Sequence, residues 1–160
     1  MAGKKHQYRV DIVWTGHHGV GTRDYRAYGR EHEIRAEGKP TILGSSDPGF
    51  RGDAARWNPE ELLVASLSAC HKLWFLHLCA VGGVVVKAYE DRAEGVMLET
   101  DDGGGHFTSV TLRPHARLAA GCDPTHAAAL HHAAHNKCFV ANSVNFAVTV
   151  APTFELEDAA

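Results

Sequence analysis

Residues 58–83, NPEELLVASLSACHKLWFLHLCAVGG, carry most of the fold prediction. Asn58 is a favoured N-cap residue, and Pro59 is tolerated at the first position of a helix. Two glutamates follow, where they suit the positive end of the helix dipole. The segment therefore predicts a helix that ends at about Val81, before a Gly-Gly pair. Its apolar residues cover too much of the circumference for a surface helix, so we expect most of it to be buried.

Outward from this helix, alternating apolar and polar residues predict strands. The predicted strands are residues 8–14, 22–30, 32–37, 84–98, 107–112, 144–150 and 154–156, and the first three should form an antiparallel meander. Residues 44–53 are rich in Gly, Ser, Pro and Asp and predict a surface loop. Asp123 and Pro124 predict the start of a second helix that runs to about Cys138.

Composition limits the class of protein. The chain has 160 residues, 44% of them hydrophobic, and a net charge of −3, which fits one globular domain over residues 1–160. No basic stripe is present, so we expect no nucleic-acid partner. The N-terminus has no apolar signal region, and the apolar run 73–86 is too short to span a bilayer. We therefore expect a cytoplasmic protein with no membrane partner.

Two of the four cysteines, Cys70 and Cys138, lie in apolar helical segments far apart in the sequence. In a reducing compartment, cysteines favour redox chemistry, metal binding or simple burial over a structural disulfide. A free cysteine in an apolar helix is often only a small buried hydrophobe. Cys79 fits that interpretation, since it faces another side of the helix, and Cys122 at a helix entrance should be exposed.

A pair of thiols also suits peroxide reduction. That chemistry needs a thiolate, a cationic group that keeps it ionised, and a second thiol that captures the sulfenic acid. The candidate cations are Arg23, Arg26 and Arg30.

The twelve histidines raise a metal hypothesis. His131 and His135 share a helical face at a spacing that can bind zinc, and Cys138 is nearby. No glutamate follows the first histidine as in zinc proteases, so we expect no metal site there.

Several motifs carry a family resemblance. They are NPEELL at 58–63, SACH at 68–71, AH at 134–135 with Cys138, and NSVNF at 142–146. In this order they resemble the OsmC and organic hydroperoxide resistance (Ohr) family of thiol peroxidases. Residues 25–32 and 44–48 resemble the OsmC-related branch in particular.

The resemblance implies an α+β fold with two antiparallel β-sheets around two long central helices, built as an intertwined homodimer. It also implies a cysteine-based peroxidase that reduces organic hydroperoxides, with hydrogen peroxide as a second substrate. Cys70 would be the peroxidatic cysteine and Cys138 the resolving one, joined in a redox-active disulfide. A dithiol reductant such as a lipoyl protein would restore the enzyme, with no metal or other cofactor.

The resemblance further implies a network of Glu60 and an arginine around the reactive thiol. The hydroperoxidase branch matches Arg23 best, whereas the OsmC-related branch favours Arg30. Glu60 and Cys70 are ten residues apart on one helix, about 15 Å at 1.5 Å per residue. Glu60 should therefore reach the site from the other subunit of a twofold dimer.

Two other functions stay open. The chain could be a non-catalytic OsmC-fold protein that binds a small apolar ligand, or a metal-binding stress protein. Neither would consume peroxide through Cys70.

Overall fold

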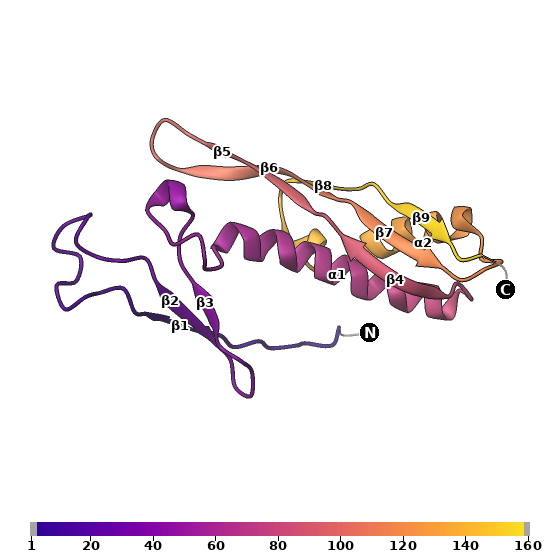
Figure 1. The fold of residues 1–160 in the computed structure, drawn as a ribbon, viewed down its shortest axis with the longest axis horizontal. Coiled ribbons are helices and arrows are strands. Elements are labelled where there is room, and N and C mark those ends of the chain that lie inside the picture. Colours follow the sequence, from indigo (N-terminus) through magenta and orange to yellow (C-terminus); the bar gives the residue numbers. More distant parts are fainter. Residues whose placement is uncertain (1–2, 159–160) are drawn as a thin grey trace. The chain divides into compact units, whose positions relative to one another are not determined.

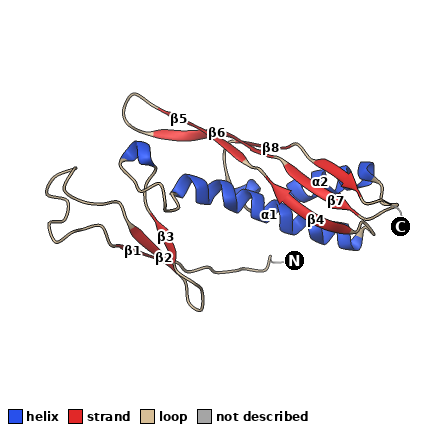
Figure 2. Cartoon of the chain, in the orientation of Figure 1, coloured by secondary structure: helices blue, strands red, loops and turns tan. Residues whose placement is uncertain are grey.

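The computed structural model describes residues 3–158, so the two terminal residues at each end of the expected domain lie outside the described part. The chain forms two compact units that divide between Leu62 and Leu63. Figure 1 follows the elements along the chain, and Figure 2 separates helices from strands. Each unit is described by itself below.

The first unit contains a small antiparallel meander. Its strands are β1 (Asp11–Trp14), β2 (His32–Arg35) and β3 (Ile42–Gly44), in the spatial order β1-β2-β3. A short 3₁₀ helix, η1 (Pro48–Phe50), interrupts the segment expected to be a loop. The antiparallel meander is confirmed, although two of its strands are shorter than predicted and the third is a different segment.

The strand predicted over residues 22–30 is wrong. Residues 15–31 form a long loop closed by hydrogen bonds from the Thr15 and Gly16 N–H groups to the Glu31 carbonyl, at 2.9 and 3.1 Å. Gly19 and Gly21 have φ angles of +76° and +61°, in the left-handed region that favours glycine. These turns end the extended backbone before residue 22. Residues 22–30 therefore form no strand, although apolar and polar residues alternate in this segment.

The predicted long helix is α1 (Pro59–Val81). The Asn58 side-chain oxygen accepts a hydrogen bond from the Glu61 N–H at 2.7 Å, and the Glu61 carboxylate accepts one from the Asn58 N–H at 3.3 Å. This capping box satisfies two backbone donors and fixes where the helix begins. By length and composition α1 also resembles a membrane span, a test that core helices of globular proteins pass as well.

The second unit contains three long, broken strands beside two helices. The first run comprises β4 (Val86–Asp91) and β5 (Glu94–Glu99), and the second β6 (Gly105–Leu112) and β7 (Pro114–Leu118). The third run comprises β8 (Ala147–Val150) and β9 (Thr153–Leu156). The breaks yield two sheets, with orders β4-β7-β9 and β5-β6-β8.

Pairing in these sheets is mixed, which corrects the expectation of two antiparallel sheets. β4 pairs with β7 and β5 with β6 antiparallel, but β6 pairs with β8 and β7 with β9 in parallel. The cause is the helix α2 (Pro124–Lys137), which lies in sequence between the central and third runs. A helical connection returns the chain to the same end of the sheet, so the next strand runs parallel.

α2 begins as predicted, because the Asp123 carboxylate accepts a hydrogen bond from the Thr125 N–H at 2.8 Å. The core of the second unit forms where both helices meet the sheets. One buried cluster joins Phe75 and Cys79 of α1 to Ala127 and Ala134 of α2 and to residues of β7. A second cluster places Leu67 against β6. Both helices therefore use one face, at turn spacing, to form the core.

The buried faces of α1 and α2 also carry a polar pair, His71 and His131. Each is 1% exposed, and His71 Nε2 lies 2.8 Å from His131 Nδ1. Burial lowers the pKa of His131 to about 3, helped by His71. Burial also lowers the pKa of His71 to about 4, with Asp91 opposing and His135 adding to the effect. Both rings are therefore neutral near pH 7.

The low histidine pKa values predict acid sensitivity. The unfolded chain binds these protons near pH 6.5, whereas the folded protein binds them only near pH 3 to 4. Stability should therefore be complete above about pH 6.5 and decrease as the pH falls toward 4, by up to about 1.4 kcal/mol per pH unit for each histidine. Urea unfolding from neutral to acidic pH measures this slope.

The control for this slope is His77, which is exposed on α1. The His131→Phe variant should have a flatter slope than wild type, while His77→Ala should keep the wild-type slope. Equal slopes in all three proteins would contradict the assignment.

Candidate thiol active site

The second unit brings Cys70 and Cys138 together. Cys70 lies near the middle of α1, and Cys138 is the C-cap residue of α2. The two thiols lie close enough to interact, because Cys70 contributes to the raised pKa of Cys138. The two thiols, 68 positions apart in the sequence, therefore meet because the helices pack against each other.

The surroundings of Cys138 hold it in place. Its side chain is buried, with 1% exposed, and its sulfur accepts a hydrogen bond from the Ala141 N–H at 3.4 Å. The Asn142 amide donates to the Cys138 carbonyl at 2.9 Å and to the Asn136 carbonyl at 3.1 Å. These bonds satisfy carbonyls at the end of the helix and fix the backbone where it leaves α2.

The two thiols have different environments. Burial, together with the neighbouring Cys70 thiol, raises the pKa of Cys138 to about 11, while the Ala141 N–H opposes the shift. Cys138 is therefore a protonated thiol at neutral pH. Cys70 is only partly buried. The geometry thus pairs one accessible sulfur with one buried, protonated thiol.

Aromatic side chains lie beside both cysteines. Trp74 follows Cys70 by one helical turn, and its ring meets Phe139 edge to face at 5.8 Å between centroids. The ammonium of Lys137 lies 5.6 Å from the centre of the Trp74 ring. Phe139 is 72% exposed. An apolar surface open to solvent therefore adjoins the thiol pair.

The remaining predicted site residues, Glu60, Arg23 and Arg30, belong to the first unit. One carboxylate oxygen of Glu60 is buried and has no hydrogen-bond partner. The Arg30 guanidinium lies 4.4 and 4.2 Å from the ring centres of Tyr25 and Tyr28. Arg23 is exposed. Their roles at the thiol stay predictions.

The other two cysteines have structural environments. Cys79 is buried in the α1 core, where burial raises the pKa of its thiol to about 11. Cys122 is half-buried rather than exposed, because it packs on the same cluster and accepts a hydrogen bond from the Val85 N–H at 3.4 Å.

Between residues 3 and 158, no three His, Cys, Asp or Glu side chains are placed to hold an ion. The His131 ring is buried against His71 instead, a contact that the sequence analysis missed. The helical spacing could have indicated that His71 is buried. His71 lies midway between Leu67 and Phe75, on the same buried face of α1.

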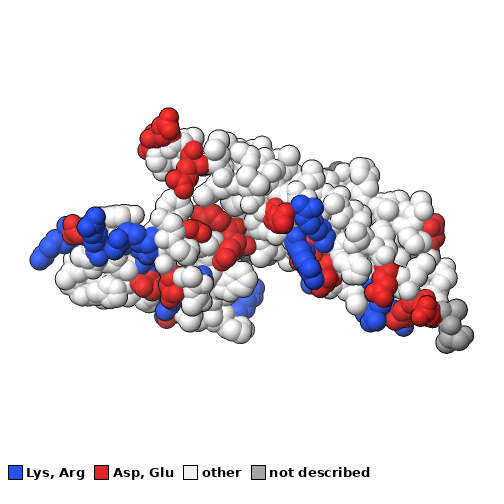
Figure 3. All heavy atoms as spheres, turned by 45° about the horizontal axis from the view of Figure 1, so that its top comes forward, with Lys and Arg blue, Asp and Glu red and all other residues white. Residues whose placement is uncertain are grey.

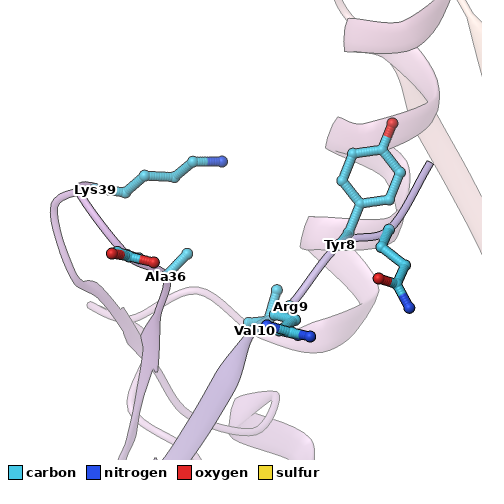
Figure 4. A pocket seen from close by; sticks show the side chains of 7 residues that line it. Tyr8, Arg9, Val10, Ala36 and Lys39 are labelled. Carbon is cyan, nitrogen blue, oxygen red and sulfur yellow. The ribbon is translucent and has the colours of Figure 1, made fainter.

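Each unit has a pocket that is not lined by cysteines. The first unit has a surface pocket of about 480 Å³ formed by residues 7–10 and by Ala36, Glu37 and Lys39. Figure 4 shows Tyr8 and Lys39 on opposite sides of a wide opening. A smaller pocket of about 150 Å³ in the second unit is lined by three histidines of α2 and by β8.

Comparison with known proteins supports the family resemblance. The family model described as OsmC-like protein matches residues 52–153. The structure of an OsmC-like protein of unknown function from Vibrio cholerae is 30% identical, with a TM-score of 0.84, covering 93% of this chain and 100% of that one. No curated protein matched the sequence.

Two organic hydroperoxide resistance proteins share the fold at lower identity. The Legionella pneumophila structure is 21% identical, with a TM-score of 0.67, covering 94% of this chain and 99% of that one. OhrB of Bacillus subtilis is 21% identical, with a TM-score of 0.61, covering 92% and 98%. With the model match over most of its length, the chain belongs to the OsmC-like protein family.

Proposed function

We propose that the protein is a thiol peroxidase that reduces organic hydroperoxides through Cys70 and Cys138. The observation that carries this proposal is the pairing of an accessible Cys70 with a buried, protonated Cys138. An accessible thiol can attack a peroxide, and a second thiol beside it can capture the sulfenic acid that forms. The names of the hydroperoxide resistance proteins that share the fold agree with this chemistry.

The proposed cycle has three balanced steps. The Cys70 thiolate attacks one peroxide oxygen, the O–O bond breaks, and the departing alkoxide takes a proton to become an alcohol. Cys70 is then a sulfenic acid, and the Cys138 sulfur attacks it to form a disulfide with release of water. A dithiol, such as a lipoyl group, reduces the disulfide and is itself oxidised to a cyclic disulfide.

Glu60 and an arginine, Arg23 or Arg30, complete the proposed site. An arginine beside Cys70 would keep it ionised and bind the leaving oxygen. The buried, unpartnered oxygen of Glu60 needs a hydrogen-bond donor, and an arginine from a twofold partner would supply one. We therefore propose a homodimer, and exposed apolar side chains such as Leu73 of α1, 64% exposed, provide surface that a partner would cover.

The proposed substrates carry an apolar group. Trp74 and Phe139 offer the surface on which an alkyl or aryl chain would lie, with the peroxide at Cys70. Hydrogen peroxide has no such group, so it should react more weakly.

We also propose a cytoplasmic location without nucleic-acid or membrane partners. On the face drawn in Figure 3, acidic and basic side chains of the second unit lie in small mixed groups. The exposed ion pairs Arg113 with Glu94 and Arg92 with Glu90 likewise combine opposite charges. Mixed charge of this kind does not attract a phosphate backbone.

Peroxidase activity should depend on each thiol in a different way. Cys70→Ser should reduce the consumption of cumene hydroperoxide, with a dithiol reductant present, to the rate measured without protein. Cys138→Ser should still oxidise once, leaving a sulfenic acid at Cys70, but should lose turnover. The matched control is Cys122→Ser. This variant should retain full activity, because Cys122 packs on the buried cluster that contains Phe75 and Cys79. Full turnover by Cys70→Ser would eliminate the peroxidase and favour a non-catalytic ligand-binding protein.

The aromatic surface should determine substrate preference. Trp74→Ala should raise KM for cumene hydroperoxide about tenfold, corresponding to about 1.4 kcal/mol of apolar contact. KM for hydrogen peroxide should not change. Val81→Ala, at the exposed end of α1, is the control. If Trp74→Ala raised both KM values equally, the ring would act on the thiols rather than on the substrate.

A further inference from the structure

The pocket between α2 and β8 in the second unit combines apolar walls with a row of imidazoles. Its volume is about 150 Å³. A cavity of about that size holds one benzene ring. The lining consists of Ala128 and three histidines of α2 together with Val148, Val150 and Pro152. The pocket therefore has room for one small ring or short chain beside the imidazole edges.

Two of the three histidines have a ring nitrogen that lacks a partner. His131 Nε2 and His135 Nδ1 are buried, and neither forms a hydrogen bond with a described residue. The two residues are one helical turn apart on α2, and the His131 side chain is buried almost completely, with 1% of the residue exposed. Buried polar atoms of native proteins nearly always have a hydrogen-bond partner. Two such nitrogens at one pocket indicate a ligand that supplies the missing bonds.

The contacts of the His131 ring turn its free nitrogen toward the pocket. On one edge of the ring, Nδ1 lies 2.8 Å from His71 Nε2 of α1. Phe75, also of α1, stacks on the ring at 3.6 Å between centroids. Among the described residues that line the pocket, none belongs to α1, so the pocket lies on the other side of the ring. The opposite edge, which carries Nε2, therefore faces the pocket, and the packed ring cannot turn to find another partner.

The chemistry of this wall favours a neutral hydroxyl group. Burial, with His71 adding to the effect, lowers the pKa of His131 to about 3, so the ring is uncharged near pH 7 and offers no cation to an acid. A neutral imidazole nitrogen is either a donor or an acceptor, and one hydroxyl group can donate and accept at the same time. Zinc usually takes three or four protein ligands, and no such group is found between residues 3 and 158.

We propose that this pocket binds a small, uncharged molecule that joins a hydroxyl group to an apolar ring or short chain. The hydroxyl group forms hydrogen bonds with His131 Nε2 and His135 Nδ1. The apolar part lies against Val148, Val150 and Pro152. The inference goes beyond the proposed peroxidase and does not depend on it, because no cysteine lines the pocket.

The test is the binding of phenol to the full-length, reduced protein near pH 7, measured by isothermal titration calorimetry. Phenol has one hydroxyl group on one ring. Toluene has a ring of the same size without the hydroxyl group, and benzoate carries a negative charge. A second readout is the NMR signal of the His131 ring nitrogens, which reports a new hydrogen bond at Nε2.

Phenol should bind at one site per chain with a Kd of about 1 mM or lower, and it should shift the His131 nitrogen signal. Toluene and benzoate should bind at least about tenfold more weakly, because toluene forms no hydrogen bond and benzoate meets no cation at His131. His131→Phe keeps an aromatic ring against Phe75 and should weaken phenol binding about tenfold, since one hydrogen bond is lost.

A matched pair of variants locates the site. Ala128 is an exposed residue of α2 that lines the pocket, so Ala128→Leu should fill the pocket and weaken phenol binding by at least about tenfold without changing the core. Ala129 is also exposed on α2 but does not belong to the lining. Ala129→Leu should therefore bind phenol as the wild type does.

Three results would overturn the proposal. Wild-type affinity in Ala128→Leu would place phenol elsewhere, for example on the surface of Trp74 and Phe139. Equal affinities for phenol and toluene would show that the imidazoles do not recognise a hydroxyl group. A Kd for phenol well above about 1 mM would show that the pocket takes no such ligand. If His131→Phe does not fold, Ala128→Leu and the toluene comparison decide.

Discussion

The packing of α1 against α2 is the constraint on which the rest of the second unit depends. Both helices bury one face against the sheets, and the buried positions follow turn spacing from Leu67 to Cys79 and from Ala127 to Cys138. The same contact that forms the core brings the Cys138 thiol to Cys70. The thiol pair therefore arises from core packing rather than from a loop, which fixes the distance between the sulfur atoms.

This arrangement places polar groups where water does not reach them. A buried imidazole nitrogen without a partner reduces stability by about 1–3 kcal/mol. The core tolerates unpartnered nitrogens at His71, His131 and His135. Buried polar groups of this kind are unusual in a core that could be wholly apolar.

Much of the fold was predictable from local signals. The caps at Asn58 and Asp123 identified both helices, because capping depends on residues adjacent in sequence. The loop over residues 15–31 was not predicted. Its glycines adopt positive φ angles that turn the chain, although the apolar and polar residues that follow them alternate as in a strand. The parallel pairing of β8 and β9 was also missed, because strand direction depends on the whole connection. The Cys70–Cys138 pair was predicted by resemblance, whereas the His71–His131 contact needs the relative rotation of two helices.

The most direct test of the account is to identify the disulfide that one equivalent of hydroperoxide forms in the reduced protein. Digestion under conditions that block thiol exchange, followed by peptide mass spectrometry, identifies the bond. The account predicts a single bridge between the peptides that contain Cys70 and Cys138, with Cys79 and Cys122 still reduced. A bridge between any other pair, or four free thiols after the hydroperoxide is consumed, would contradict it.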